Sequence, residues 1–104
     1  MSSKPSPKYL SVKEQFPEYL DAVESLGKTI RKQGPIDEKT AQLIQLAASV
    51  ATRSEGAAHS HTKRALDAGA SKEEIYHTLM LLTSTIGFPN VMAGICWADD
   101  VIKG

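Results

Sequence analysis

The residue best suited to carry chemistry in this sequence is His61, which stands in a run of small residues. If the run is helical, the residues on the face of His61 lie within about one sixth of a turn of it, given 3.6 residues per turn. The space they leave is either filled by a closely packed helix or left open as a pocket. In a pocket, His61 could act as a general acid or base, because histidine ordinarily titrates near a pKa of about 6.5. In a packed core it would instead be a structural hydrogen-bond partner. The neighbours on this face are Ser54, Ala57, Ala58, Ala65 and Ala68.

Two other residues of the same run, Glu55 and His59, are expected to form an exposed pair on the helix and not a metal site. Glu55 and His59 are four residues apart, a spacing that lets them pair along one side of a helix. His59 and His61 diverge by about 200° around a helix, and the ligand spacings of structural zinc sites are absent. We therefore expect no metal site formed by Glu55, His59 and His61.

The single cysteine, Cys96, has no second thiol with which to form an intramolecular disulfide. A lone thiol on a helix is usually buried and inert, and this is what we expect here. The sequence also lacks the G-x-S-x-G motif, the glycine-rich phosphate loop and the dinucleotide fingerprint. We therefore expect no cofactor.

The composition is that of an ordinary globular protein of one domain. The chain has 104 residues, of which 41% are hydrophobic and 23% are charged. Twelve basic residues balance twelve acidic ones, so we expect no nucleic-acid partner. The start of the chain has no apolar signal segment, and the longest aliphatic run, residues 79–82, is far shorter than the ~20 residues of a membrane span. We expect a cytoplasmic protein with no membrane partner.

Helical spacing of the apolar residues, with no period-two alternation, predicts an all-α fold of about five helices. Residues 1–10 are expected to form a flexible tail and residues 11–104 the helical domain, in which a short turn at 11–15 could precede the first long helix. Gly56 leaves open whether the second and third helices are continuous. The five helices are expected to start at Pro17, after Asp37, near Ser54, at Ser71 with Glu74 in a capping box, and at Pro89; the first four end near Gly34, Arg53, Gly69 and Ile86.

The chain carries more apolar positions than one small domain needs. Some apolar residues lie off the helix faces that are expected to form the core, namely Leu46, Met80 and Leu81. Trp97 points away from the core side of the last helix. Monomers rarely expose large apolar patches, and aromatic residues are enriched in interface cores. These positions therefore predict a homo-oligomer.

The order of these motifs resembles the carboxymuconolactone decarboxylase and alkylhydroperoxidase D superfamily. The resemblance covers residues 16–103 and is most specific in the spacing His61-x3-Ala65-x3-Gly69, followed by Glu74-Ile75. Members are all-helical and assemble as trimers or as hexamers made from dimers. The resemblance thus implies a compact alkylhydroperoxidase D-like fold and a trimer or hexamer.

The peroxidase branch of this superfamily uses two cysteines, a glutamate and a histidine. At the corresponding positions this chain has Ser54, Ala57, Gln42 and His61, so only the histidine matches. A serine hydroxyl cannot replace the thiolate, which is the nucleophile and forms the disulfide. The resemblance therefore favours a decarboxylase-like lyase over an alkylhydroperoxidase D-like antioxidant protein of the peroxiredoxin type.

The decarboxylase branch implies a cofactor-free enzyme acting on a small organic acid or lactone. His61 would be the acid that protonates a dienolate left by loss of carbon dioxide. Glu55 would orient or polarise the reacting groups. Gln42 and Ser54 would donate hydrogen bonds to the substrate, with Ala57 beside them. Two alternatives stay open: a redox protein that uses Cys96 alone, and a non-catalytic oligomeric protein that binds a small ligand or acts as a scaffold.

Overall fold

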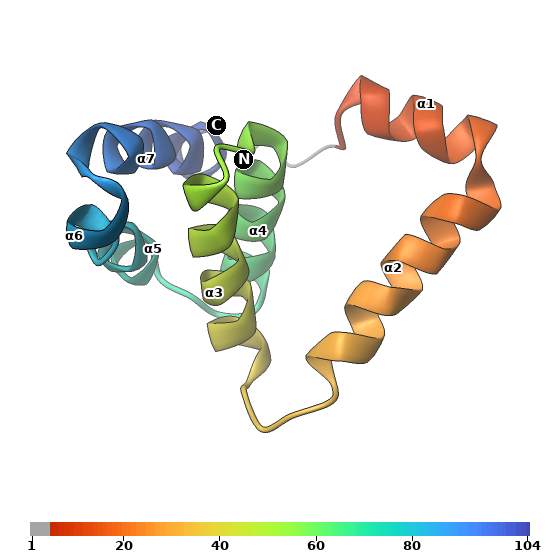
Figure 1. Ribbon diagram of the computed structural model, residues 1–104, viewed down its shortest axis with the longest axis horizontal. Coiled ribbons are helices and arrows are strands. Elements are labelled where there is room, and N and C mark those ends of the chain that lie inside the picture. The colour runs from red at the N-terminus through yellow and green to blue at the C-terminus, as the bar shows by residue number, and fades with distance from the viewer. Residues whose placement is uncertain (1–4) are drawn as a thin grey trace. The chain divides into compact units, whose positions relative to one another are not determined.

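Helices form all the regular structure of residues 5–104, the part of the chain that the computed structural model describes (Figure 1). The predicted all-α fold is confirmed. The chain divides into two compact units, residues 5–37 and residues 38–104. None of the described helices is both long enough and apolar enough to cross a membrane. In order, the helices are α1 (Pro7–Gln15), α2 (Pro17–Arg31), α3 (Glu38–Ala51), α4 (Glu55–Asp67), α5 (Lys72–Met80), α6 (Thr83–Ile86) and α7 (Phe88–Ile102).

Helix α1 begins before residue 11, where the helical domain was expected to start. Ser6 caps the helix by accepting a hydrogen bond from the N–H of Tyr9 at 3.1 Å, and Pro7 occupies the first turn. These two start signals are enough to extend the helix into the segment that we expected to be a tail. Residues 1–4 of that segment lie outside the described residues.

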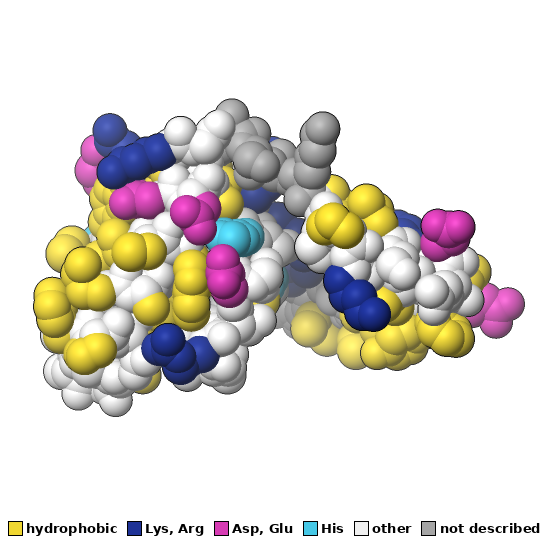
Figure 2. Space-filling view, turned by 90° about the horizontal axis from the view of Figure 1, so that it is seen from above, with side chains coloured by type: hydrophobic (Ala, Val, Ile, Leu, Met, Phe, Trp, Pro, Cys, Tyr) yellow, Lys and Arg dark blue, Asp and Glu magenta, His cyan; other side chains and the backbone are white. Residues whose placement is uncertain are grey.

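Polar contacts join α1 to α2, while the apolar stripe of α2 is largely exposed. The Tyr9 hydroxyl donates to the Glu24 carboxylate, and the Lys13 ammonium pairs with the same carboxylate at 3.3 Å. Leu20 is the buried residue of α2. Residues 5–37 therefore do not bury this stripe among themselves, and hydrophobic side chains lie on the surface of this unit (Figure 2). The exposed stripe consists of Phe16, Tyr19, Val23, Leu26 and Ile30.

Helices α3 and α4 are separate elements that lie side by side (Figure 1). The chain reverses just before α4, at Arg53, and not at Gly56. Arg53 has a φ of 56°, in the left-handed region that favours glycine. The N–H of Ser54 then donates to the carbonyl of Ser49 at 2.8 Å, which closes the turn.

The fourth predicted helix is divided into α5 and α6. Its start is the predicted capping box: the Ser71 hydroxyl accepts from the Glu74 N–H at 3.0 Å, and the Glu74 carboxylate accepts from the Ser71 N–H at 2.9 Å. We expected the helix to continue to Ile86, but α5 ends at Met80. The Thr83 hydroxyl donates to the Met80 carbonyl at 2.8 Å, so a side chain competes with the backbone for this acceptor.

The core of residues 38–104 lies where α3, α4, α5 and α7 meet. Helix α7 approaches α3 closely, because a Cβ added to Gly94 would lie 2.7 Å from Val50 Cγ1. Only glycine allows the two backbones to come this close. The buried core cluster consists of Leu46, Val50, Ala58, Ala65, Ala70, Ile75, Leu79 and Ala98.

The surplus apolar positions divide between the core and the surface. Leu46 is fully buried in the core, so the expectation that it is surplus was wrong. Met80 and Leu81 are more than half exposed. Trp97 packs partly against the core, and the guanidinium of Arg53 lies 5.7 Å from the centre of its ring.

Gly94→Ala should destabilise the fold, because the new Cβ cannot fit against Val50 without moving α7. Overpacking of this kind typically costs about 1–3 kcal/mol. Urea denaturation followed by circular dichroism would measure the loss. Gly56→Ala is the matched control, because a Cβ there meets nothing within 4 Å and alanine favours the helix. An unchanged midpoint for Gly94→Ala would contradict the close packing.

Candidate functional site

His61 on α4 is bound to Gln42 on α3. Its Nδ1 lies 2.8 Å from Gln42 Oε1. Gln42 is almost completely buried, with 1% of its surface exposed, and its Nε2 donates to Glu38 Oε1 at 2.8 Å. A glutamate, an amide and an imidazole thus form a continuous polar chain between the two helices.

This polar chain fixes which nitrogen of His61 carries the proton. The Glu38 carboxylate can only accept, so the amide nitrogen of Gln42 must face it and the amide oxygen must face His61. An amide oxygen is likewise only an acceptor, so Nδ1 of His61 carries a hydrogen. In the neutral ring, Nε2 therefore holds the lone pair and is the nitrogen that can exchange a proton.

The face of small residues around His61 is packed on one side. Ala58 and Ala65 are fully buried in the core. His61 and Ala57 are only partly buried, so they lie at the edge of the packed region. Close helix packing accounts for the inner alanines.

Ser54 lies on the same side of α4 as His61 but at its start. It is the N-cap of α4, and its side chain makes no capping hydrogen bond. Seven residues separate it from His61, which is about 10 Å along a helix. A bound molecule would have to reach along Ala57 to contact both side chains.

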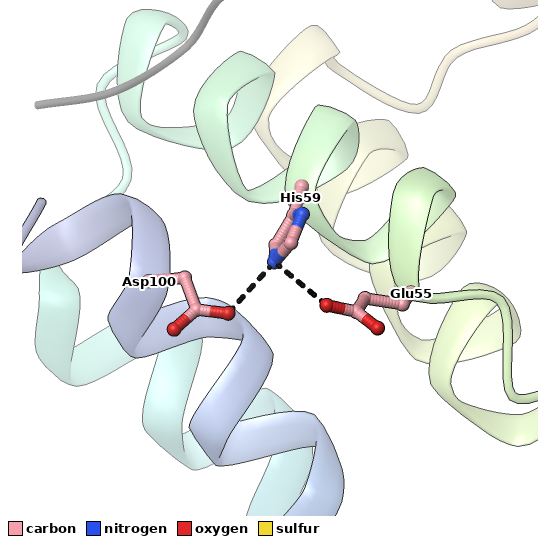
Figure 3. A group of neighbouring side chains, drawn as sticks. All are labelled: Glu55, His59 and Asp100. Carbon is pink, nitrogen blue, oxygen red and sulfur yellow. Dashed lines mark hydrogen bonds and ion pairs between the residues drawn. The ribbon is translucent and has the colours of Figure 1, made fainter. Parts of the chain in front are cut away.

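The structure places Glu55 in a different group from His61. Nε2 of His59 lies 3.9 Å from Glu55 Oε2 and 2.9 Å from Asp100 Oδ2 on α7 (Figure 3). The predicted pairing of Glu55 with His59 along the helix is therefore present at this longer distance. His59 and His61 point to different sides of α4, as their spacing requires.

Sequence reasoning missed Asp100 and misjudged Cys96. Asp100 is 41 residues from His59, and no motif links the two positions. Cys96 is exposed, so the expectation of a buried thiol was wrong. It borders an open hollow of about 520 Å³ near the end of α7, which is lined by Cys96, Asp99, Asp100, Lys103 and Gly104.

Asp99, next to Asp100, has a structural role between α5 and α7. Its carboxylate accepts a hydrogen bond from the Tyr76 hydroxyl and pairs with Lys103 at 3.4 Å. The hydrogen bond to this carboxylate raises the pKa of Tyr76 above its ordinary value. Asp99 and Asp100 therefore belong to different contacts, although they are adjacent in sequence.

Comparison with known proteins identifies the family from the sequence. Residues 17–100 match the carboxymuconolactone decarboxylase family. The chain belongs to this family. It is also similar to an uncharacterized protein of Methanocaldococcus jannaschii, with 30% identity over 84 residues that cover 81% of this chain and 78% of that protein. No solved structure gives a significant match.

Within the carboxymuconolactone decarboxylase family, the resemblance to the peroxidase branch singled out four positions, two of which the structure joins. Gln42, at the position where the resemblance implies a glutamate, contacts His61. Ser54 and Ala57, at the positions where it implies cysteines, lie at the start of α4. The structure thus joins Gln42 and His61 across α3 and α4.

The protonation of Nδ1 in neutral His61 can be tested by ¹⁵N nuclear magnetic resonance at alkaline pH. We expect Nε2 to show the shift of an unprotonated nitrogen. Gln42→Leu removes the acceptor and should move the ring toward the other tautomer. Gln45→Leu, on the same helix, is the control and should leave the pattern unchanged. Protonation at Nε2 in the wild type would contradict the assigned amide orientation.

Proposed function

We propose that this chain is a cofactor-free enzyme of the carboxymuconolactone decarboxylase family that acts on a small organic acid or lactone, with His61 as the general acid. The observation that carries the proposal is the 2.8 Å hydrogen bond from His61 Nδ1 to the buried Gln42. An acid catalyst needs a fixed orientation and a defined nitrogen for proton transfer, and this bond supplies both.

The proposed reaction is a decarboxylation followed by proton transfer. Loss of carbon dioxide from an unsaturated lactone acid breaks a carbon–carbon bond and leaves the electron pair on a dienolate. Nε2 of the His61 imidazolium gives its proton to the dienolate carbon. The neutral ring keeps the hydrogen on Nδ1, which still donates its hydrogen bond to Gln42. Solvent then restores the proton on Nε2. Gln42 accepts the same hydrogen bond in both states, so the ring does not turn during the cycle.

The other predicted site residues have different relations to this centre. Gln42 already donates to Glu38, so its part in the proposal is to orient His61. Ser54 and Ala57 lie on the same side of α4 as His61, and in the proposal the Ser54 hydroxyl donates a hydrogen bond to a carboxylate of the substrate. Glu55 contacts His59, and any influence it has on the reaction would be electrostatic and act from another side of the helix.

His61→Ala should lower activity about 100- to 10,000-fold, the usual effect of losing a positioned acid or base. Cys96→Ser should leave activity nearly unchanged, because no other thiol is present to form an intramolecular disulfide. The assay is release of carbon dioxide from a panel of unsaturated lactone acids and keto acids. Circular dichroism of both variants would show whether the fold is kept.

The second candidate, a thiol-dependent redox protein, is favoured by one observation, the exposure of Cys96. Peroxide turnover that needs Cys96 and tolerates His61→Ala would establish it and overturn the proposed mechanism. Binding of small acids without any turnover would support instead the non-catalytic ligand-binding protein. Each of the three functions therefore predicts a different outcome for the same pair of variants.

We also propose that the working form is a homo-oligomer, a trimer or a hexamer. Support comes from the apolar stripe of α2, which residues 5–37 do not bury among themselves, and from Met80 and Leu81, which are exposed on the other unit. Hydrophobic side chains gather on the visible surface of both units (Figure 2). Burying such side chains typically contributes about 1.5–3 kcal/mol each.

Leu26→Asp should dissociate the oligomer, because it puts a charge into the apolar stripe. Sedimentation equilibrium at micromolar concentration would measure the mass of the wild type and the variant. Ser25→Asp is the control, because residue 25 is exposed and points away from the stripe on a helical wheel. A monomeric wild type would contradict the proposal.

A further inference from the structure

The group of Glu55, His59 and Asp100 brings three metal-ligating side chains together at the surface of α4 and α7. Their ligand atoms all lie within 4.8 Å of one another. The carboxylates of Glu55 and Asp100 approach the same nitrogen of His59, Nε2, from two sides (Figure 3). We infer that these three residues bind a divalent transition-metal ion, for which Zn²⁺ is the probe.

The distances fit a shared ion. Zinc binds histidine nitrogen and carboxylate oxygen at about 2.0–2.2 Å, which puts two ligand atoms of a tetrahedral site about 3.4 Å apart. The separations from His59 Nε2, 2.9 Å to Asp100 and 3.9 Å to Glu55, lie on either side of that value. Shifts of about half an ångström suffice, and both carboxylates are exposed enough to move.

Hydrogen bonding alone leaves this arrangement incompletely satisfied. Nε2 of His59 can carry one hydrogen, so it can donate a good hydrogen bond to only one of two carboxylates. The closer one, Asp100, takes it, and Glu55 is left at 3.9 Å beside a like charge. A cation between the three ligand atoms would balance both carboxylates at once.

The backbone that carries the ligands is held in place. Glu55 and His59 are one helical turn apart on α4, a spacing at which two side chains can share an ion. Asp100 lies two residues after Ala98 on α7, and Ala58 directly precedes His59 on α4; both alanines are fully buried in the core. Small buried residues keep the two helices close, so a metal would find the three ligands already near their places.

The ligand set indicates the class of ion. One imidazole and two carboxylates form a mixed nitrogen and oxygen set without sulfur, which suits Zn²⁺, Co²⁺, Ni²⁺ or Mn²⁺ better than thiolate-seeking ions. Two carboxylates and a neutral imidazole together balance the charge of a divalent ion. Water would fill the remaining positions, as it does in zinc sites with three protein ligands.

The test is isothermal titration calorimetry with Zn²⁺ on the full chain in a Cys96→Ser background, after treatment with a chelator. This background removes the exposed thiol, which could bind zinc by itself. We expect one Zn²⁺ per chain with a micromolar dissociation constant. Loss of even an outer partner of a ligand costs about 10- to 100-fold in metal affinity, so His59→Ala and Asp100→Asn should each weaken binding by at least about tenfold.

Three controls keep the test specific. Asp99→Asn changes the adjacent acid on α7 and should leave affinity unchanged, as should His77→Ala, which removes an exposed histidine on α5. His61→Ala should also bind Zn²⁺ normally, so failure of the proposed acid catalysis would not affect this result. Unchanged binding in His59→Ala and Asp100→Asn, or binding only at millimolar Zn²⁺, would overturn the metal site.

Discussion

The close approach of α7 to α3 and α4 is the constraint on which the arrangement of residues 38–104 depends. A side chain at Gly94 would overlap Val50 on α3. Completely buried alanines, Ala58 on α4 and Ala98 on α7, belong to the same core. Because these small residues allow close backbone contact, polar side chains at the edges of the three helices meet at fixed positions. The functional groups are therefore a consequence of how the apolar core is packed.

Helix α4 contributes to two polar groups because its two histidines, two residues apart, face different neighbouring helices. His61 faces α3 and meets a buried amide, whereas His59 faces α7 and meets carboxylates. A neutral amide oxygen fixes the ring without adding charge, which suits an acid that must gain and lose a proton. Two carboxylates instead create a negatively charged surface site that suits a cation. The two histidines thus differ in chemical environment because a different helix packs beside each of them.

The sequence predicted best those features that depend on residues close together in the chain. The capping box joins Ser71 and Glu74, which are three positions apart, and local spacing alone predicted it. The contact of Gln42 with His61 joins residues 19 positions apart, and it was anticipated only because a family resemblance placed both in one site. Asp100, 41 positions from His59, could not be anticipated, since its place depends on how α7 packs against α4.

Helix α2 shows why apolar periodicity alone does not locate a core. Its stripe predicts a buried face, yet Leu20 is buried while Tyr19, Leu26 and Ile30 are exposed. Isolated helices of this length are marginal in water, and most helical stability in proteins comes from packing of the apolar face. The polar contacts of Glu24 with α1 are exposed or partly exposed and contribute little by comparison. The periodicity of α2 therefore identifies which side of the helix is apolar, whereas burial of that side depends on what packs against it.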